Sequence, residues 1–216
     1  MLVLAAPAEA AIGQSQGTTD NQTVTESVTV IIDPYISLEI NTAGGFSHTL
    51  TNAGIKTARA AARDYTKKFY SLFGTAFGLV ADSNNNAGWK VQAKIADLSD
   101  GTNTLAATNM YISNASVDTS KTNITGYANI NSSAVGNSRG RIGDTVTDLA
   151  DETSTLGFGL TTSYQDMLGS ATNGSTTSAK PGRMALTAKL GLLYDTNIAA
   201  SATGYVGEIS FVIVNL

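Results

Sequence analysis

Alternation of apolar and polar residues recurs along this chain of 216 residues and limits it to folds built from β-strands. Trp89–Ile95 and Met184–Leu192 carry an apolar residue at every second position, and Ile36–Ile40 does the same over a shorter run. Because successive side chains of a strand point to opposite faces of a sheet, each run predicts a strand that buries one face in a core.

Two further runs extend this pattern toward the ends of the chain. Val24–Ile32 mixes valine and isoleucine with threonine and serine and predicts an N-terminal strand. Tyr205–Leu216 predicts a closing strand that is apolar on both faces near its end, so we expect it to be central in its sheet or covered. Weaker strands are predicted at Asn109–Ile112, Asn123–Ile130 and Leu156–Thr161.

Polar turn clusters separate the predicted strands, as at Asp82–Asn86, Ser99–Asn103 and Thr172–Ser175. Many strands, polar turns and little helix predict a mainly β protein. We expect a single jelly-roll-like β-sandwich over residues 23–216, preceded by an extended N-terminal arm over residues 1–22.

One segment departs from the alternation. Its apolar residues recur at spacings of three and four, which predicts one amphipathic helix over about residues 55–72. The polar side of that helix carries a basic stripe, made of Lys56, Arg59, Arg63 and Lys67. The chain up to Ile55 contains no lysine or arginine and several acidic residues. The stripe is therefore either a solvated helix face or a surface that meets the acidic arm of the same or a neighbouring subunit.

The composition narrows the class of protein. Charged residues make up 14% of the chain, against roughly 25% in ordinary soluble domains, while hydrophobic residues still reach 42%. Threonine, serine, asparagine and glycine fill the difference, which is typical of surface-exposed β proteins. The absence of cysteine excludes disulfide scaffolds, zinc fingers and thiol catalysis. The net charge of −4 gives no general reason to bind nucleic acid, and no apolar run is long enough to predict a membrane span.

The motifs that suggest catalysis lack the surrounding sequence that a catalytic site of that kind requires. Gly136–Gly140 matches the G-x-S-x-G pattern of a nucleophile elbow, but asparagine-, serine- and glycine-rich sequence surrounds it instead of a strand and a helix. His48 is the only histidine and precedes Ser138, whereas the hydrolase order places the histidine last. We therefore expect a protein that is not an enzyme and carries no cofactor.

A calcium site is the one metal alternative that the sequence leaves open. Asp82, Asn84 and Asn86 resemble the opening of a calcium loop, but the glycine at position 88 falls one place late for an EF-hand and no glutamate closes the loop. A second acidic cluster comprises Asp144, Asp148, Asp151 and Glu152. Five sequons offer glycosylation sites in a secreted protein, at Asn21, Asn114, Asn123, Asn131 and Asn173.

The first twelve residues have two interpretations. They resemble the end of a secretory signal, with an A-x-A cleavage site at Ala8–Ala10, although a basic n-region is missing. Alternatively, the segment is retained as a strand with one apolar side that docks on a neighbouring subunit. The candidate interface residues are Leu2, Val3, Leu4, Ala6, Ala8, Ala10 and Ile12.

In build, the chain resembles the TasA/camelysin-like biofilm-fibre proteins and the related archaeal bundling pili. The resemblance rests on the N-terminal strand Val24–Ile32, the Ala-Gly-Trp entry at Trp89, the Ser99–Gly101 turn and the closing Gly204–Gly207 strand entry. It implies a β-sandwich subunit that assembles through an N-terminal donor strand. We therefore expect a subunit of an extracellular, head-to-tail homopolymer. A monomeric secreted or cell-surface adhesin, or a surface-layer module that binds glycan or protein, is the alternative.

Overall fold

The computed structural model describes residues 27, 29–42, 45–62, 68–123, 140–152, 156–169 and 181–215. The chain divides into two units, Met1–Asp33 and Pro34–Leu216. In the first unit, the described residues Ser27 and Thr29–Asp33 are exposed and belong to no helix or strand. No helix among the described residues has the length and apolar character needed to cross a membrane.

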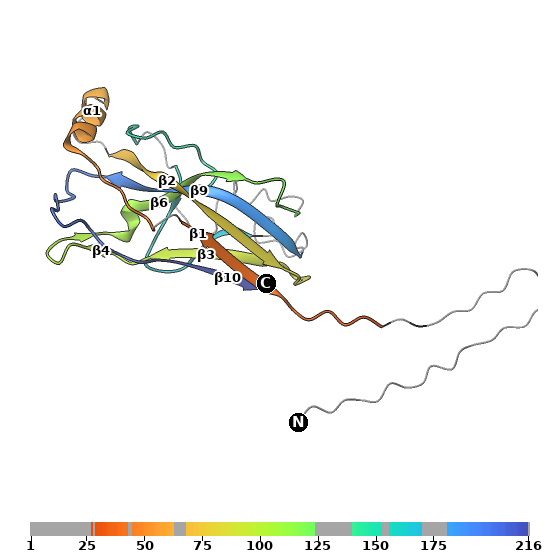
Figure 1. The fold of residues 1–216 in the computed structure, drawn as a ribbon. Coiled ribbons are helices and arrows are strands. Elements are labelled where there is room, and N and C mark those ends of the chain that lie inside the picture. The colour runs from red at the N-terminus through yellow and green to blue at the C-terminus, as the bar shows by residue number, and fades with distance from the viewer. Residues whose placement is uncertain are drawn as a thin grey trace, which may run out of the picture. The chain divides into compact units, whose positions relative to one another are not determined.

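The second unit is mainly β, with two antiparallel sheets that form a sandwich (Figure 1). One sheet has five strands in the order β1-β2-β9-β6-β7, and the other has three in the order β10-β3-β8. The five-stranded sheet comprises β1 (Ile36–Asn41), β2 (Phe69–Ser83), β9 (Gly182–Tyr194), β6 (Met110–Val117) and β7 (Phe158–Gly159). The three-stranded sheet comprises β10 (Ile209–Asn215), β3 (Trp89–Ile95) and β8 (Gln165–Gly169).

The smaller elements cap the sandwich. β4 (Leu98–Ser99) and β5 (Thr104–Leu105) form a hairpin whose turn is held by the Asp100 carboxylate, which accepts hydrogen bonds from the backbone of Thr102 at 2.9 Å and Asn103 at 2.6 Å. A 3-10 helix (Ala107–Asn109) precedes β6. The bonds from Asn103 and Thr102 hold the pKa of Asp100 well below its usual value.

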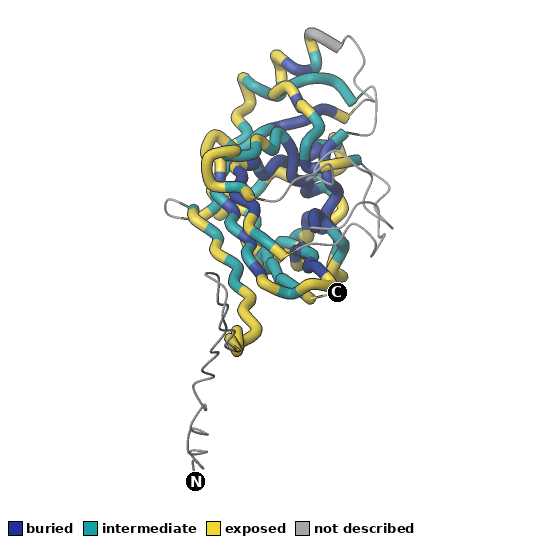
Figure 2. Tube along the Cα trace, turned by 90° about the vertical axis from the view of Figure 1, so that its right-hand side faces the viewer, coloured by how far each residue is buried: buried dark blue, intermediate teal, exposed yellow. Residues whose placement is uncertain are grey.

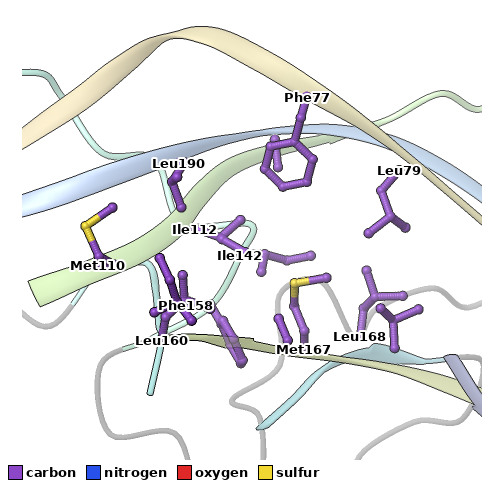
Figure 3. Packing of buried hydrophobic residues seen from close by; sticks show 14 of the residues in the cluster. Phe77, Leu79, Met110, Ile112, Ile142, Phe158, Leu160, Met167, Leu168 and Leu190 are labelled. Carbon is purple, nitrogen blue, oxygen red and sulfur yellow. The ribbon is translucent and has the colours of Figure 1, made fainter. Parts of the chain in front are cut away.

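The main hydrophobic core lies between the two sheets. Figure 3 shows Phe77 and Leu79 of β2 pointing toward Met167 and Leu168 of β8 across this interior. Trp89 of β3 is fully buried, and its indole nitrogen donates a hydrogen bond to the Gly182 carbonyl at 3.0 Å. The inward faces of the predicted alternating strands therefore meet as a two-layer sandwich requires.

A second, smaller cluster covers the opposite face of the five-stranded sheet. Tyr70 and Tyr111 make an edge-to-face pair with ring centroids 5.3 Å apart, and Val146 and Leu193 pack against them. The segment 140–152, which contains Val146, covers this face of the sheet. The backbone amide of Tyr70 donates to the Ala150 carbonyl at 2.9 Å, which fixes this covering segment along β2. The start of β2 is consequently buried on both of its faces.

Several predicted strands are confirmed. β3 spans Trp89–Ile95, and its residues alternate between buried and half-buried along its whole length. β9 contains the predicted Met184–Leu192 run, and β1 contains Ile36–Ile40. The observed strand β6 starts one residue later than the predicted strand Asn109–Ile112 and is longer than it. The predicted strand Leu156–Thr161 is observed only as the two residues of β7. Of the predicted Asn123–Ile130 strand, only Asn123 lies within the described residues.

The predicted helix is confirmed up to Ala62 and is wrong from Lys68 to Leu72, while residues 63–67 lie outside the described residues. The observed helix α1 covers Asn52–Ala62, and its first turn is capped by the Thr51 hydroxyl, which accepts a hydrogen bond from the Gly54 amide at 3.1 Å. Phe69 and Leu72, which were expected on the helix, lie in β2 and pair with β9. Their spacing of three matched a helical face because both faces of this strand are covered, which hides the period of two.

Two strand predictions near the chain ends are also wrong. The expected strand Val24–Ile32 is not a strand at its described residues, Ser27 and Thr29–Ile32, because no described strand pairs with them. The closing strand was expected to be central or covered. Within the described part of the chain, β10 lies at the edge of its sheet and pairs only with β3, so its residues Ile209–Val214 are half-buried.

Candidate assembly surface

The edge of β10 is the least protected sheet edge among the described strands. Native proteins usually shield open edges with charged residues, proline or very short strands. β10 has seven residues and no charge or proline, whereas the edge strand β1 carries Glu39 and the edge strand β8 carries Asp166. The fourth edge strand, β7, has only two residues. β10 thus presents the longest uncharged edge in the described part of the sandwich.

The hydrogen-bonding pattern shows which backbone groups of β10 face outward. The Ala96 amide donates to the Glu208 carbonyl at 2.9 Å, and this pair continues the register in which Ile209 lies opposite Ile95. Hydrogen-bonded pairs alternate along an antiparallel ladder, so Ser210, Val212 and Val214 bond to β3. The amides and carbonyls of Ile209, Phe211, Ile213 and Asn215 are therefore directed toward the open edge.

The side chains of β10 are apolar on both faces of the strand. Ile209, Phe211 and Ile213 pack against the main core, and the Phe211 ring lies 5.7 Å from the Phe77 ring. Val212 and Val214 occupy the other face. β1 lies in contact with β10, and together these two edge strands border one side of the sandwich (Figure 1). The apolar character of β10 is typical of an interior strand, yet the described residues leave its edge open.

A second apolar feature lies in the first unit. Val30, Ile31 and Ile32 are three consecutive apolar residues that are 75%, 86% and 77% exposed (Figure 2). Valine and isoleucine favour strands and are normally buried there. Isolated apolar residues at a surface are ordinary, but three in succession with a strand-forming pattern form a candidate association surface.

The residues after this segment are firmly placed. In the second unit, the Tyr35 amide donates to the Asn84 side chain at 2.6 Å, and the Asn84 amide donates to the Tyr35 carbonyl at 3.1 Å. These two bonds hold Tyr35 on the turn that joins β2 to β3. Only Asp33 and Pro34 separate Tyr35 from Ile32.

The interface residues predicted in the arm lie outside the described residues, from Leu2 through Ile12. The basic stripe is described only in part. Lys56 is exposed on α1 and Arg59 is half-buried, while Arg63 and Lys67 lie outside the described residues. Whether the stripe meets an acidic arm therefore stays a prediction.

The calcium candidates have structural partners. The Asn84 side chain caps the Tyr35 amide, and Asp82 lies in β2 between Ser37 of β1 and Arg183 of β9. Asn86 is exposed in the following turn. The geometry thus engages Asn84 in protein bonds instead of leaving its oxygen for a cation.

The second acidic cluster is spread along the segment that covers β2. One Asp144 oxygen accepts from the backbone amides of Arg141 at 2.8 Å and Gly157 at 3.0 Å, while Asp148 accepts from the Leu72 amide at 2.8 Å. Among the described residues, no three histidine or acidic side chains come together as a metal site would require. These carboxylates bind backbone amides and so fix the fold of the covering segment.

The structure brings together one group of polar side chains that no sequence pattern connects. The Nε2 atom of His48 lies 2.7 Å from the Ser71 hydroxyl, the His48 ring stacks on Phe73 at 4.7 Å, and the Asp148 charge acts on the ring. Burial lowers the pKa of His48, and Asp148 partly opposes this effect. No sequence motif relates these residues, because 23 positions separate His48 from Ser71.

This group resembles a catalytic triad in its residue types but not in its access. Ser71 is only 1% exposed, so its hydroxyl cannot reach a substrate. The hollow beside Phe73 measures about 10 Å³, which is roughly the space of one water molecule. The contact therefore fixes the segment that carries His48 against β2. Ser138 of the G-x-S-x-G match lies outside the described residues.

The two described sequons carry asparagines with structural hydrogen bonds. The Asn114 side chain donates to the Val146 carbonyl and accepts from the Val146 amide, both at 3.0 Å. The Asn123 side chain accepts from the Arg183 amide at 2.6 Å. A glycan on the amide nitrogen of Asn114 would compete with its bond to Val146. Asn21, Asn131 and Asn173 lie outside the described residues.

Comparison of the chain with protein-family models, with curated proteins and with solved structures finds no match in any of the three.

Proposed function

We propose that this protein is a structural subunit of an extracellular filament. Each subunit polymerises by inserting an N-terminal strand into the sheet of a neighbouring subunit. Such strand addition supplies backbone hydrogen bonds along a sheet edge and takes specificity from alternate side chains. A head-to-tail contact of this kind uses different surfaces on the two partners, so it propagates into a fibre unless it closes into a ring.

The observation that carries the proposal is the exposure of Val30, Ile31 and Ile32. They continue the alternating run that starts at Val24, and within the described residues they have no strand partner. A strand pattern without a strand partner among the described residues, together with an uncharged apolar edge, fits an interaction between chains. The low charge content and the lack of cysteine support an exposed structural role outside the cell.

Magnitudes indicate how much of the N-terminal region must take part. Full burial of a valine or isoleucine side chain stabilises by about 1.5–3 kcal/mol, so these three residues contribute on the order of 5–9 kcal/mol. Association costs an estimated 4–15 kcal/mol in lost freedom of motion. Three side chains alone give a weak contact. The preceding apolar residues of the arm, Leu2–Ile12, are the natural source of further binding energy.

The test compares three variants with the full-length protein by sedimentation velocity and negative-stain electron microscopy. The first lacks residues 1–12. The second carries Val30→Asp and Ile32→Asp, which place charges on the exposed apolar face. The third carries Thr162→Asp and Ser163→Asp, a matched control that adds the same charge at polar, exposed positions outside the proposed donor strand and outside β10.

We expect filaments of the full-length chain and of the control. The Val30/Ile32 variant is expected to remain a folded monomer, because a buried charge cancels the gain from apolar contact. The deletion of residues 1–12 is expected to raise the protein concentration needed for assembly. A full-length protein that stays monomeric at high concentration would instead favour an adhesin or surface-layer module. Filaments unaffected by every variant would rule out an N-terminal strand as the link.

A further inference from the structure

We propose that the free edge of β10 is the surface that receives the donated strand, and that residues Thr29–Ile32 of a second copy of this chain pair along it. This inference rests on the proposed function and adds to it the acceptor and the described part of the donor. The acceptor edge presents the outward backbone groups of Ile209, Phe211 and Ile213.

β10 is preferred over the other open edges for electrostatic and geometric reasons. A strand added to β1 would lie beside Glu39, and one added to β8 would lie beside Asp166, which already pairs with Lys90 at 3.0 Å. Acidic residues are frequent in the N-terminal region, which carries Glu9, Asp20, Glu26 and Asp33 and no lysine or arginine up to Ile55. Like charges on adjacent strands destabilise pairing, so the uncharged edge is the favourable one.

The donor matches β10 on both faces. Val30 and Ile32 point to one side of an extended segment, and Ile31 points to the other. β10 likewise offers Phe211 and Ile213 on its core side and Val212 and Val214 on its outer side. A strand added there has apolar neighbours on both faces. Its core side would cover the half-buried edge of the main core between β10 and β1.

The connection between the donor and its own subunit's β1 does not suit a tight two-residue turn. Two residues, Asp33 and Pro34, lie between Ile32 and the anchored Tyr35. Two-residue hairpins need a positive φ at both central residues, or glycine at the first. Proline fixes φ near −65° and Asp33 is not glycine, so Asp33 and Pro34 do not form a two-residue hairpin turn. A second copy reaches the edge without any such turn and is the occupant proposed.

The absence of native cysteine allows a direct test by engineered crosslinking. A series of double variants carries Val212→Cys on β10 together with cysteine at position 29, 30, 31 or 32. A matched series carries Glu39→Cys on β1, and a second carries Gln165→Cys on β8, with the same four donor positions. Each protein is assembled under reducing conditions, oxidised and separated on a non-reducing denaturing gel, and linked peptides are identified by mass spectrometry.

We expect a ladder of disulfide-linked dimers, trimers and larger species with Val212→Cys at one or two donor positions, and monomers with Glu39→Cys and Gln165→Cys. A ladder confined to β1 or β8 overturns the assignment of β10 and leaves the filament intact. Filaments without any β10 crosslink also overturn it. A faster-migrating monomer with an internal disulfide would place the donor on its own subunit and overturn exchange between copies. Failure of the unmodified chain to form filaments refutes the proposed function itself.

Discussion

Asn114 shows how a single side chain replaces backbone pairing in this protein. Its φ of 55° lies in the left-handed region, within the irregular part of β6 where the register to β9 shifts between Ser113 and Ser116. The Asn114 amide group donates to and accepts from the backbone of Val146, much as a neighbouring strand residue would. The segment that covers Tyr70 and Tyr111 is held in part by these two bonds.

We predict that Asn114→Ala lowers the free energy of unfolding by about 3 kcal/mol. Three part-buried hydrogen bonds are lost at roughly 0.7 kcal/mol each, two with Val146 and one from the Ser113 hydroxyl, and a residue with a Cβ must keep the left-handed conformation at roughly 1 kcal/mol. Asn114→Gly is the matched control, because glycine adopts this conformation freely and loses only the bonds. Urea unfolding measures both. Equal destabilisation by alanine and glycine would show that the positive φ carries no cost.

His48 gives the protein a specific dependence of stability on pH. Burial lowers its pKa in the folded state, so the folded protein favours the neutral ring more than the unfolded chain does. The stabilisation is complete above the unfolded pKa of about 6.5 and is lost as the pH falls below it.

We predict that the urea concentration at the unfolding midpoint of the wild-type protein decreases when the pH is lowered from 7.5 to 5.5. We expect His48→Gln to remove most of this decrease. The chain has no other histidine, and ordinary carboxylates titrate at lower pH. Glutamine keeps a hydrogen-bonding partner for Ser71 without titrating. An identical decrease in the variant would assign the effect to other groups.

At the scale of elements, strands whose apolar residues alternate were predictable, and the strand whose start is buried on both faces was not. β3 and β9 were found from their alternation, since every second residue is buried in both and Thr187 and Lys189 interrupt the burial in β9. β2 was missed because Phe69, Tyr70 and Ser71 are all buried, and its place is decided by pairing with β9 more than a hundred positions away. The residues around β2 in the sequence do not indicate which distant strand will pair with it.

The same reasoning explains the error at β10. Its apolar residues on both faces correctly mark a strand that is suited to an interior place, but the described chain offers no strand for its outer edge. The candidate site was therefore predictable only as an apolar pattern. Which edge stays open depends on the order of the strands, and that order is a property of the whole sandwich.

We predict that Val212→Lys raises the critical concentration for assembly at least tenfold while leaving the folded monomer intact. A lysine on an edge strand is a common natural protection against pairing, and tenfold corresponds to about 1.4 kcal/mol. Sedimentation measures assembly, and thermal unfolding checks the fold. Ala87→Lys, at an exposed turn position, is the matched control. Equal assembly of the two variants would remove β10 from the interface.

At the scale of the whole molecule, one kind of association between copies accounts for two apolar surface features. The sandwich has an uncharged edge at β10, and the first unit carries an exposed apolar segment at Val30–Ile32. Each is unfavourable in isolation, since open edges and consecutive exposed apolar residues both promote association. A polymer in which one copy completes the next removes both at once.

The most direct test of this interpretation is negative-stain electron microscopy of the purified full-length protein over a series of increasing concentrations. We predict filaments one subunit wide or bundles of them above a critical concentration, with repeated subunits joined head to tail. Monodisperse single particles at every concentration would contradict the filament proposal.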